Sequence, residues 1–191
     1  MVERIMTIEL DRQTEEDQIT RLVAAAHQDP KAFGQLYLLF AQPVFRYLYS
    51  RTGSVPEAED LTAQTFLGAL ERFPSYRHKG YFASWLFSMA HNKATDYFRH
   101  KGKHKPIEAI ESVPADINVL HQVIQAERVL GLTKLLHSLA EREQELIRLR
   151  YVADLSFAEI GQVLGQKEDT VKKTLYRLLA RLKVQLEDSH V

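Results

Sequence analysis

The basic side chains near the C-terminus have the spacing of one face of a helix. Val171, Leu175 and Leu178 recur at intervals of four and three residues, which is the apolar pattern of an amphipathic helix. The positions between them would lie on the opposite face, and they carry hydroxyl, ammonium, phenol and guanidinium groups: Thr170, Lys172, Lys173, Tyr176, Arg177 and Arg181. Lysine and arginine neutralise phosphates, and arginine also pairs with the edge of guanine in the major groove. This face therefore predicts binding to duplex DNA.

The residues that precede this face predict a helix-turn-helix. Ser156 and Glu159 have the spacing of a capping box at the start of a helix. Gly165 stands where a short helix would end in a left-handed cap. Two short helices joined by such a turn form the motif that places its second helix in the major groove. The alternative is a hairpin of two helices with a solvated polar face.

A second group of side chains, between residues 76 and 99, combines aromatic rings with positive charge. Rings and bases alternate from Tyr76 to Phe82, and a helix expected over 83–99 follows with a polar face. Aromatic rings stack on unpaired bases, and cations hold the backbone of a single strand. The residues assigned to an unpaired strand are Tyr76, Arg77, Lys79, Tyr81, His91, Asn92 and Arg99. The alternative is that Tyr76 and Tyr81 cover the hydrophobic core.

The elements that must position these groups are helical. Apolar residues recur with helical period in nearly every segment, and no segment alternates as a strand would. The period is lost between Gly102 and Asn118, a stretch that contains two prolines. We therefore predict an all-α protein with two small helical domains, over 18–103 and 128–187. A flexible linker over 104–127 would join them, and the second domain would contain the helix-turn-helix.

Charge is segregated along a chain whose formal net charge is zero. Residues 77–105 hold seven lysines and arginines against one aspartate, a net charge of +6. Residues 167–183 hold six against two acidic residues, a net charge of +4. Two separate basic zones favour two separate contacts with a polyanion such as DNA.

The composition argues against several other classes of protein. The 191 residues include no cysteine, so disulfides and thiolate metal sites are excluded. A signal pattern is absent, as is an apolar run of about 20 residues that a membrane span needs. We expect a cytoplasmic protein without membrane insertion. The chain has no phosphate-binding glycine loop, nucleophile elbow or HExxH motif, and His100 and His104 lack a third metal ligand, so we expect no enzyme, metal or cofactor.

Three runs of residues together resemble a known family. The run from Glu57 to Phe66 and the run from Phe82 to Arg99 resemble the region 2 domain of extracytoplasmic-function (ECF) sigma factors. The stretch from Leu139 to Tyr151, with the helix-turn-helix after it, resembles their region 4 domain. The resemblance covers about residues 18–186, with both motifs in the family's order.

The resemblance implies a partner and a role for each part of the chain. Glu57, Asp60, Leu61 and Gln64 would dock on the clamp helices of the largest subunit of core RNA polymerase. The loop before Trp85 and the polar helix face after it would capture and melt the promoter's −10 element. The second helix of the helix-turn-helix would recognise the −35 element. Such factors direct promoter recognition and transcription initiation, and many have an anti-sigma factor as a partner.

Some positions depart from the family's pattern. Lys167 replaces the usual serine at the start of the recognition helix, and Thr174 stands where an arginine is usual. These changes affect which promoter is recognised rather than the class of protein. The alternative is a helix-turn-helix regulator that binds duplex DNA without docking on core polymerase, and binding to core polymerase would discriminate between the two.

Overall fold

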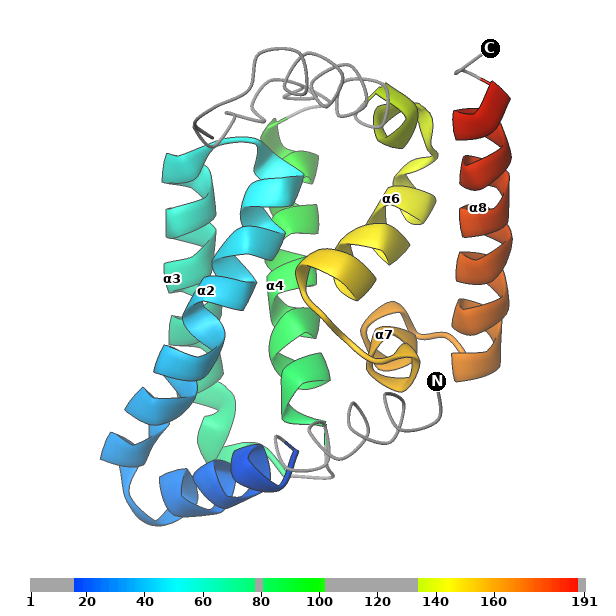
Figure 1. Ribbon diagram of the computed structural model, residues 1–191. Coiled ribbons are helices and arrows are strands. Elements are labelled where there is room, and N and C mark those ends of the chain that lie inside the picture. The colour runs from blue at the N-terminus through cyan, green and yellow to red at the C-terminus, as the bar shows by residue number, and fades with distance from the viewer. Residues whose placement is uncertain (1–15, 78–80, 102–133, 189–191) are drawn as a thin grey trace, which may run out of the picture. The chain divides into compact units, whose positions relative to one another are not determined.

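The computed structural model describes residues 16–77, 81–101 and 134–188. Within these ranges every regular element is a helix (Figure 1), which confirms the predicted all-α class. The chain divides into two compact units, residues 1–106 and 107–191. The linker predicted over 104–127, with His104, lies outside the described residues.

The first unit is built on three long helices. A helix over 16–28 and the short turn η1 (Pro30–Ala32) lead into α2 (Phe33–Thr52), α3 (Val55–Arg72), the turn η2 (Phe73–Ser75) and α4 (Phe82–Lys101). Asp29 caps η1, because its carboxylate accepts from the Lys31 amide at 3.0 Å. Pro43 lies inside α2 without ending it, and Gly53 ends α2 in the left-handed conformation with φ of 67°.

The core of the first unit lies where α2, α3 and α4 pack against one another in pairs (Figure 1). Tyr47 and Leu48 of α2 and Leu86 and Phe87 of α4 are fully buried. Their spacing along each helix follows the helical period, so each helix turns one apolar stripe inward. Burial of this apolar area is the main force that holds the three helices together.

The second unit carries the helix-turn-helix. Residues 134–138 are helical, and α6 (Glu141–Ile147), the π-helical turn η3 (Arg148–Val152), α7 (Phe157–Leu164) and α8 (Glu168–Asp188) follow. Its core is apolar, with the side chains of Leu146, Leu149, Ile160, Val171 and Leu175 buried.

The predicted cap and turn of the helix-turn-helix are confirmed. The Ser156 hydroxyl accepts from the Glu159 amide at 3.3 Å, and the Glu159 carboxylate accepts from the Ser156 amide at 2.8 Å. This reciprocal pair is a capping box, and it fixes the start of α7. Gly165 ends α7 with φ of 63°, and the Gln166 amide then donates to the Gly161 carbonyl at 2.7 Å. Because a left-handed residue is best supplied by glycine, local sequence alone sets this turn.

The described residues offer no membrane span and no metal site. None of the helices over 16–77, 81–101 and 134–188 is long and apolar enough to cross a bilayer. Over the same ranges, no group of three or more histidine, aspartate or glutamate side chains could hold a metal ion.

Candidate nucleic-acid interface

The exposed face of α8 has the composition that the sequence predicts. Val171, Leu175 and Leu178 point into the core of the second unit and are buried. The side chains on the opposite face are exposed: Thr170, Lys172, Lys173, Tyr176, Arg177 and Arg181. The predicted division of this helix into an apolar and a basic face is confirmed, and its binding to DNA stays a prediction.

Two aromatic rings fix the relative position of the helices in the helix-turn-helix. The Tyr176 ring on α8 lies edge-on to the Phe157 ring at the start of α7, with centroids 5.9 Å apart. The Arg150 guanidinium lies 5.1 Å from the centre of that Phe157 ring, and it donates to the Leu155 carbonyl at 2.8 Å. A cation over a ring face is attracted by the ring quadrupole. Arg150 thus braces the start of α7, a role that its place in the sequence does not indicate.

Arg181 differs from Lys172, Lys173 and Arg177 because it has an acidic partner on another helix of its own unit. Its guanidinium donates to the Glu143 carboxylate on α6 at 2.8 Å, and this hydrogen bond holds the pKa of Glu143 below its ordinary value. The pair ties the C-terminal half of α8 to α6. Lys172, Lys173 and Arg177 lie nearer the start of the helix, and none of them forms an ion pair with another residue that the structure describes.

Tyr76 belongs to the core of the first unit. Its side chain is 9% exposed, and its ring centroid lies 4.4 Å from that of Trp85 and 5.8 Å from that of Phe82. Burial raises the pKa of its phenol to about 12. The prediction that this ring is available to stack on a base is therefore wrong, and the alternative that it covers the core holds. The turn η2 folds the chain back, which brings Tyr76 onto the first turn of α4.

The rest of the predicted aromatic and basic loop is only partly described. Tyr81 is 41% exposed and stands just before α4, and Arg77 is also exposed. Lys79 lies outside the described residues. Tyr81 is thus the exposed ring that the described part of this loop offers for stacking.

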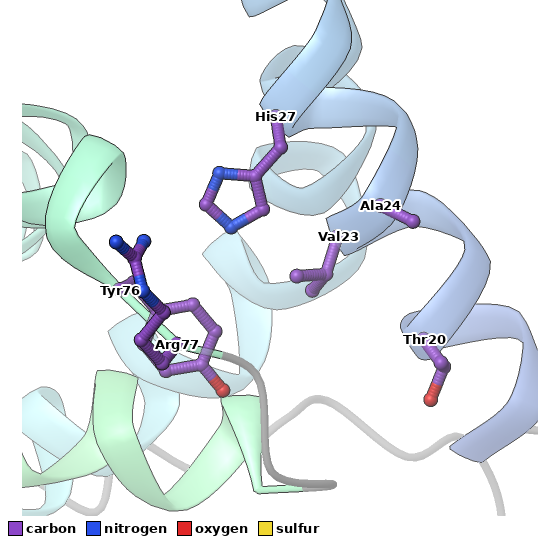
Figure 2. Close-up of a pocket in the computed structure, with 6 residues that line it drawn as sticks. All are labelled: Thr20, Val23, Ala24, His27, Tyr76 and Arg77. Carbon is purple, nitrogen blue, oxygen red and sulfur yellow. The ribbon is translucent and has the colours of Figure 1, made fainter.

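A small pocket opens beside this loop. It has a volume of about 310 Å³ and lies between the helix over 16–28 and the start of the loop (Figure 2). His27 and Val23 face Tyr76 and Arg77 across it, and the His27 ring is stacked on Phe73 with centroids 4.6 Å apart. The pocket is lined by Thr20, Val23, Ala24, His27, Tyr76 and Arg77.

Fewer polar side chains of α4 are available to bind DNA than its sequence indicates. The hydroxyls of Ser84, Ser88 and Thr95 donate to carbonyls of their own or the preceding turn, at 3.0, 2.7 and 2.8 Å. Asn92 is exposed. Arg99 is exposed too, and its guanidinium pairs with Asp96 at 3.0 Å. The amide of Asn92 is consequently the side chain of this face best suited to a base edge, because it both donates and accepts.

His91 lies between this polar face and α2. Its Nδ1 atom is 3.2 Å from the Tyr47 hydroxyl and 3.2 Å from a guanidinium nitrogen of Arg51. Sequence reasoning missed Arg51 and Tyr47, because they precede His91 by 40 and 44 residues. Only the packing of α2 against α4 brings the three together.

The predicted docking residues on α3 are not all on the surface. Asp60 is exposed, and its carboxylate accepts from the Gln64 amide at 2.8 Å. Leu61 is only 3% exposed and packs in the core, so the prediction that it forms part of an exposed docking surface is wrong. It lies on the buried stripe, with Ala58 and Thr65 one turn before and after it.

Glu57 is held by the end of α4. Its carboxylate accepts from Lys101 at 2.9 Å and from the Tyr97 hydroxyl at 3.3 Å, and the bond from Lys101 lowers its pKa. Hydrogen bonds to Tyr97 and Glu57 raise the pKa of Lys101. Because its carboxylate is hydrogen-bonded to Lys101 and Tyr97, Glu57 joins the start of α3 to the end of α4.

Two exposed leucines on α3 were missed. Leu67 is 59% exposed and Leu70 is 48% exposed. With Asp60 and Ala63 they recur every three or four residues along the outer side of the helix. That period is visible in the sequence, but Leu70 follows the buried Ala69 directly and stands at the edge of the apolar stripe.

Comparisons with known proteins identify both units. Residues 36–104 match the family model for Sigma-70 region 2, and residues 130–182 match the model for Sigma-70, region 4. The chain is 34% identical over 166 residues to the ECF RNA polymerase sigma factor BldN of Streptomyces coelicolor, covering 82% of this chain and 61% of that protein. It is 31% identical over 153 residues to the ECF RNA polymerase sigma factor SigM of Bacillus subtilis, covering 78% of this chain and 91% of that protein.

A solved structure has a similar fold. The structure of CnrH in complex with the cytosolic domain of CnrY matches with a TM-score of 0.63 and 22% sequence identity, covering 87% of this chain and 96% of that one. At this identity the likeness concerns the fold.

Proposed function

Because the chain belongs to the ECF family of RNA polymerase sigma factors, alternative sigma factors that direct transcription initiation, we propose how its surfaces divide that work. The outer side of α3 docks on core RNA polymerase. The start of α4 and the loop before it hold the unpaired −10 strand, and the basic face of α8 recognises the −35 element. The chain acts in the cytoplasm without being an enzyme, and it needs no cofactor.

The exposed basic face of α8 is the observation that carries the proposal for the −35 element. Lys172, Lys173 and Arg177 stand on the first half of a helix whose other side is buried. The N-terminal half of a recognition helix is the part that enters the major groove. Arg181 lies further along α8 and is tied to α6 by Glu143, so it has a supporting role.

Duplex binding by this face is tested with paired variants. The double variant Lys173→Ala with Arg177→Ala should weaken binding to a −35 duplex, and it should lower the salt slope by about one unit for each phosphate that is no longer neutralised. Lys183→Ala is the matched control. Lys183 is an exposed base of the same helix, and it lies past the C-terminal end of the basic face. If the double variant and the control bind the duplex equally, α8 does not recognise the −35 element through these residues.

Strand capture is assigned to Tyr81, Asn92 and Arg77, with Lys79 as the further base that the sequence places in the loop. Separating one stacked step costs about 1.4 kcal/mol. Stacking one base on an exposed ring returns about 1–3 kcal/mol. With one exposed ring in the described part of the loop, capture of a single base offsets about one or two steps, and polymerase contacts supply the remainder.

Permanganate footprinting of unpaired thymines tests strand capture. Asn92→Ala should bind core polymerase and the −35 duplex as the parent does, but lose thymine reactivity, and a premelted template should restore transcription. Thr95→Ala is the control, since the Thr95 hydroxyl is exposed one turn away and donates to its own helix. If unpaired thymines remain fully reactive in the Asn92→Ala variant, Asn92 does not capture the strand.

Docking on core polymerase is assigned to the outer side of α3, with Asp60 as its acid, Gln64 as the amide beside it, and Leu67 and Leu70 as its apolar contacts. A charge-assisted hydrogen bond from Asp60 would contribute about 1.5–3 kcal/mol. Asp60→Ala and Leu67→Ala should each weaken binding to core polymerase, measured by gel filtration or by fluorescence anisotropy. Asp17→Ala should not, because this exposed acid lies on the helix over 16–28 and not on α3. Equal binding by all three variants would contradict the assignment.

A second protein partner is proposed for the same surface. An anti-sigma factor that covers Leu67 and Leu70 would exclude core polymerase from α3 by direct competition. Such a partner should protect the α3 amides from hydrogen exchange, and adding core polymerase should displace it.

A further inference from the structure

A three-residue polar cluster joins α2 to the polar face of α4. One guanidinium nitrogen of Arg51 lies 3.2 Å from His91 Nδ1, 3.3 Å from the Tyr47 hydroxyl and 3.4 Å from the His91 carbonyl oxygen. The Tyr47 hydroxyl is itself 3.2 Å from His91 Nδ1. The contacts of Tyr47 and Arg51 with the imidazole ring are both at Nδ1, on the side that faces α2.

The chemistry of these groups selects one form of the imidazole. A guanidinium has donors and no acceptor, so the nitrogen that faces it must accept. A neutral imidazole whose Nδ1 accepts carries its proton on Nε2. The cluster therefore favours the neutral His91 tautomer that donates from Nε2.

The side chains of Tyr47 and Arg51 are held in place by aromatic packing. The Tyr47 ring is fully buried and lies edge-on to Phe87, with centroids 5.6 Å apart. The Arg51 guanidinium lies 5.8 Å from the centre of the Phe98 ring. Because Tyr47 and Arg51 both contact Nδ1, they restrain the plane of the His91 ring. The next residue of α4 is the exposed Asn92.

We propose that Arg51 and Tyr47 are positioning residues that hold His91 as an Nε2–H donor to oxygen acceptors of the unpaired −10 strand. This inference rests on the proposed role of α4 in strand capture. It adds to that role a fixed donor beside Asn92, set by two residues of α2 that need not touch DNA. Backbone phosphates and base carbonyls both supply the oxygen acceptor that this donor requires.

Long-range ¹⁵N–¹H correlation of the imidazoles in the full chain tests the tautomer directly. At about pH 8 histidine side chains are ordinarily neutral, and the His91 signals are assigned by their loss in His91→Gln. The parent should show Nδ1 unprotonated and Nε2 protonated. Arg51→Met and Tyr47→Phe, each checked for parental helix content, should raise the fraction with the proton on Nδ1. A parent with the proton on Nδ1, or two variants with the parent's tautomer ratio, would overturn the proposal.

Two substitutions of His91 then test the donor in the holoenzyme. Glutamine places an amide nitrogen near the position of Nε2, whereas asparagine can accept from Arg51 but does not reach that position. His91→Asn should weaken binding to a fork-junction probe with an unpaired −10 strand by about 2- to 12-fold, the effect of one hydrogen bond. His91→Gln should restore most of that loss. If His91→Asn binds the probe as the parent does, or His91→Gln restores nothing, Nε2 is not the donor.

The same holoenzyme assay separates this inference from the proposed function. Suppose that Asn92→Ala fails to open the promoter while His91→Asn binds the fork-junction probe as the parent does. Strand capture by α4 would then be supported, and the role of His91 would be overturned. A parent holoenzyme that opens no promoter, or Asn92→Ala that opens promoters fully, would overturn strand capture by this face and the inference with it. Defects in Asn92→Ala and His91→Asn, with rescue by His91→Gln, support both.

Discussion

Replacing Gly161 by alanine should destabilise the helix-turn-helix, although alanine is the better helix former. Gly161 is buried inside α7, and a Cβ atom there would lie 2.6 Å from the Gln166 carbonyl oxygen. That oxygen belongs to the turn between α7 and α8, so relief of the clash must move the backbone of the turn. The Gln166 amide also donates to the Gly161 carbonyl at 2.7 Å, and this hydrogen bond would be strained by the same movement.

The size of the effect follows from three contributions. Forcing an extra methyl group into a packed site costs about 1–3 kcal/mol, and losing the turn's hydrogen bond costs about 1 kcal/mol. The better helix propensity of alanine returns about 1 kcal/mol. We expect the free energy of unfolding of the second unit to fall by about 1–3 kcal/mol, a range set mainly by the overpacking cost.

Gly68→Ala is the matched control, because a Cβ at this glycine of α3 meets nothing within 4 Å. It should raise stability by about 1 kcal/mol through helix propensity alone. Urea unfolding, followed by circular dichroism and by the amide signals of the unit that carries the substitution, measures both variants. Fluorescence anisotropy with a −35 duplex should show weaker binding for Gly161→Ala. If Gly161→Ala is stabilising, as the control is, the close approach at Gln166 does not constrain the turn.

Four further substitutions test the assignments around the interfaces. Tyr76→Ala should lower the unfolding free energy by about 3–5 kcal/mol as a large core truncation, whereas Tyr81→Ala should leave stability unchanged and reduce thymine reactivity in footprinting. Lys101→Met should reduce the pH dependence of stability that Glu57 contributes, because Lys101 donates the hydrogen bond that lowers its pKa most. The lowered pKa of this carboxyl stabilises the fold at neutral pH, and that stability is lost as the pH falls below about 4.5, so parent and variant melting temperatures should converge in acid. Arg181→Ala should cost about 0.2–1 kcal/mol of stability and change the salt slope of −35 binding little; a slope lower by a full unit would return Arg181 to the phosphate-binding face.

Local chemistry in the sequence determined the helices and the turn between α7 and α8. The Ser156 and Glu159 side chains satisfy backbone amides three residues away, and Gly165 takes a backbone conformation that its own lack of a Cβ permits. These interactions need no distant partner. The helical period likewise assigned Val171 and Leu175 to the core, because both lie at the middle of a broad apolar stripe.

Tertiary structure decided the residues at the edges of those stripes. Periodicity gives the direction of a side chain around its helix, but the neighbouring helix sets how wide the buried face is. Leu61 falls inside that face, and Leu70 falls outside it. Tyr76 follows η2 in extended backbone, and its burial depends on Phe82 and Trp85 of α4. Long polar side chains raise the same problem, because they reach across to other helices. The partners of Arg181 and His91 lie 38 or more residues away, where only the packing of whole helices determines which charges and hydrogen-bonding groups meet.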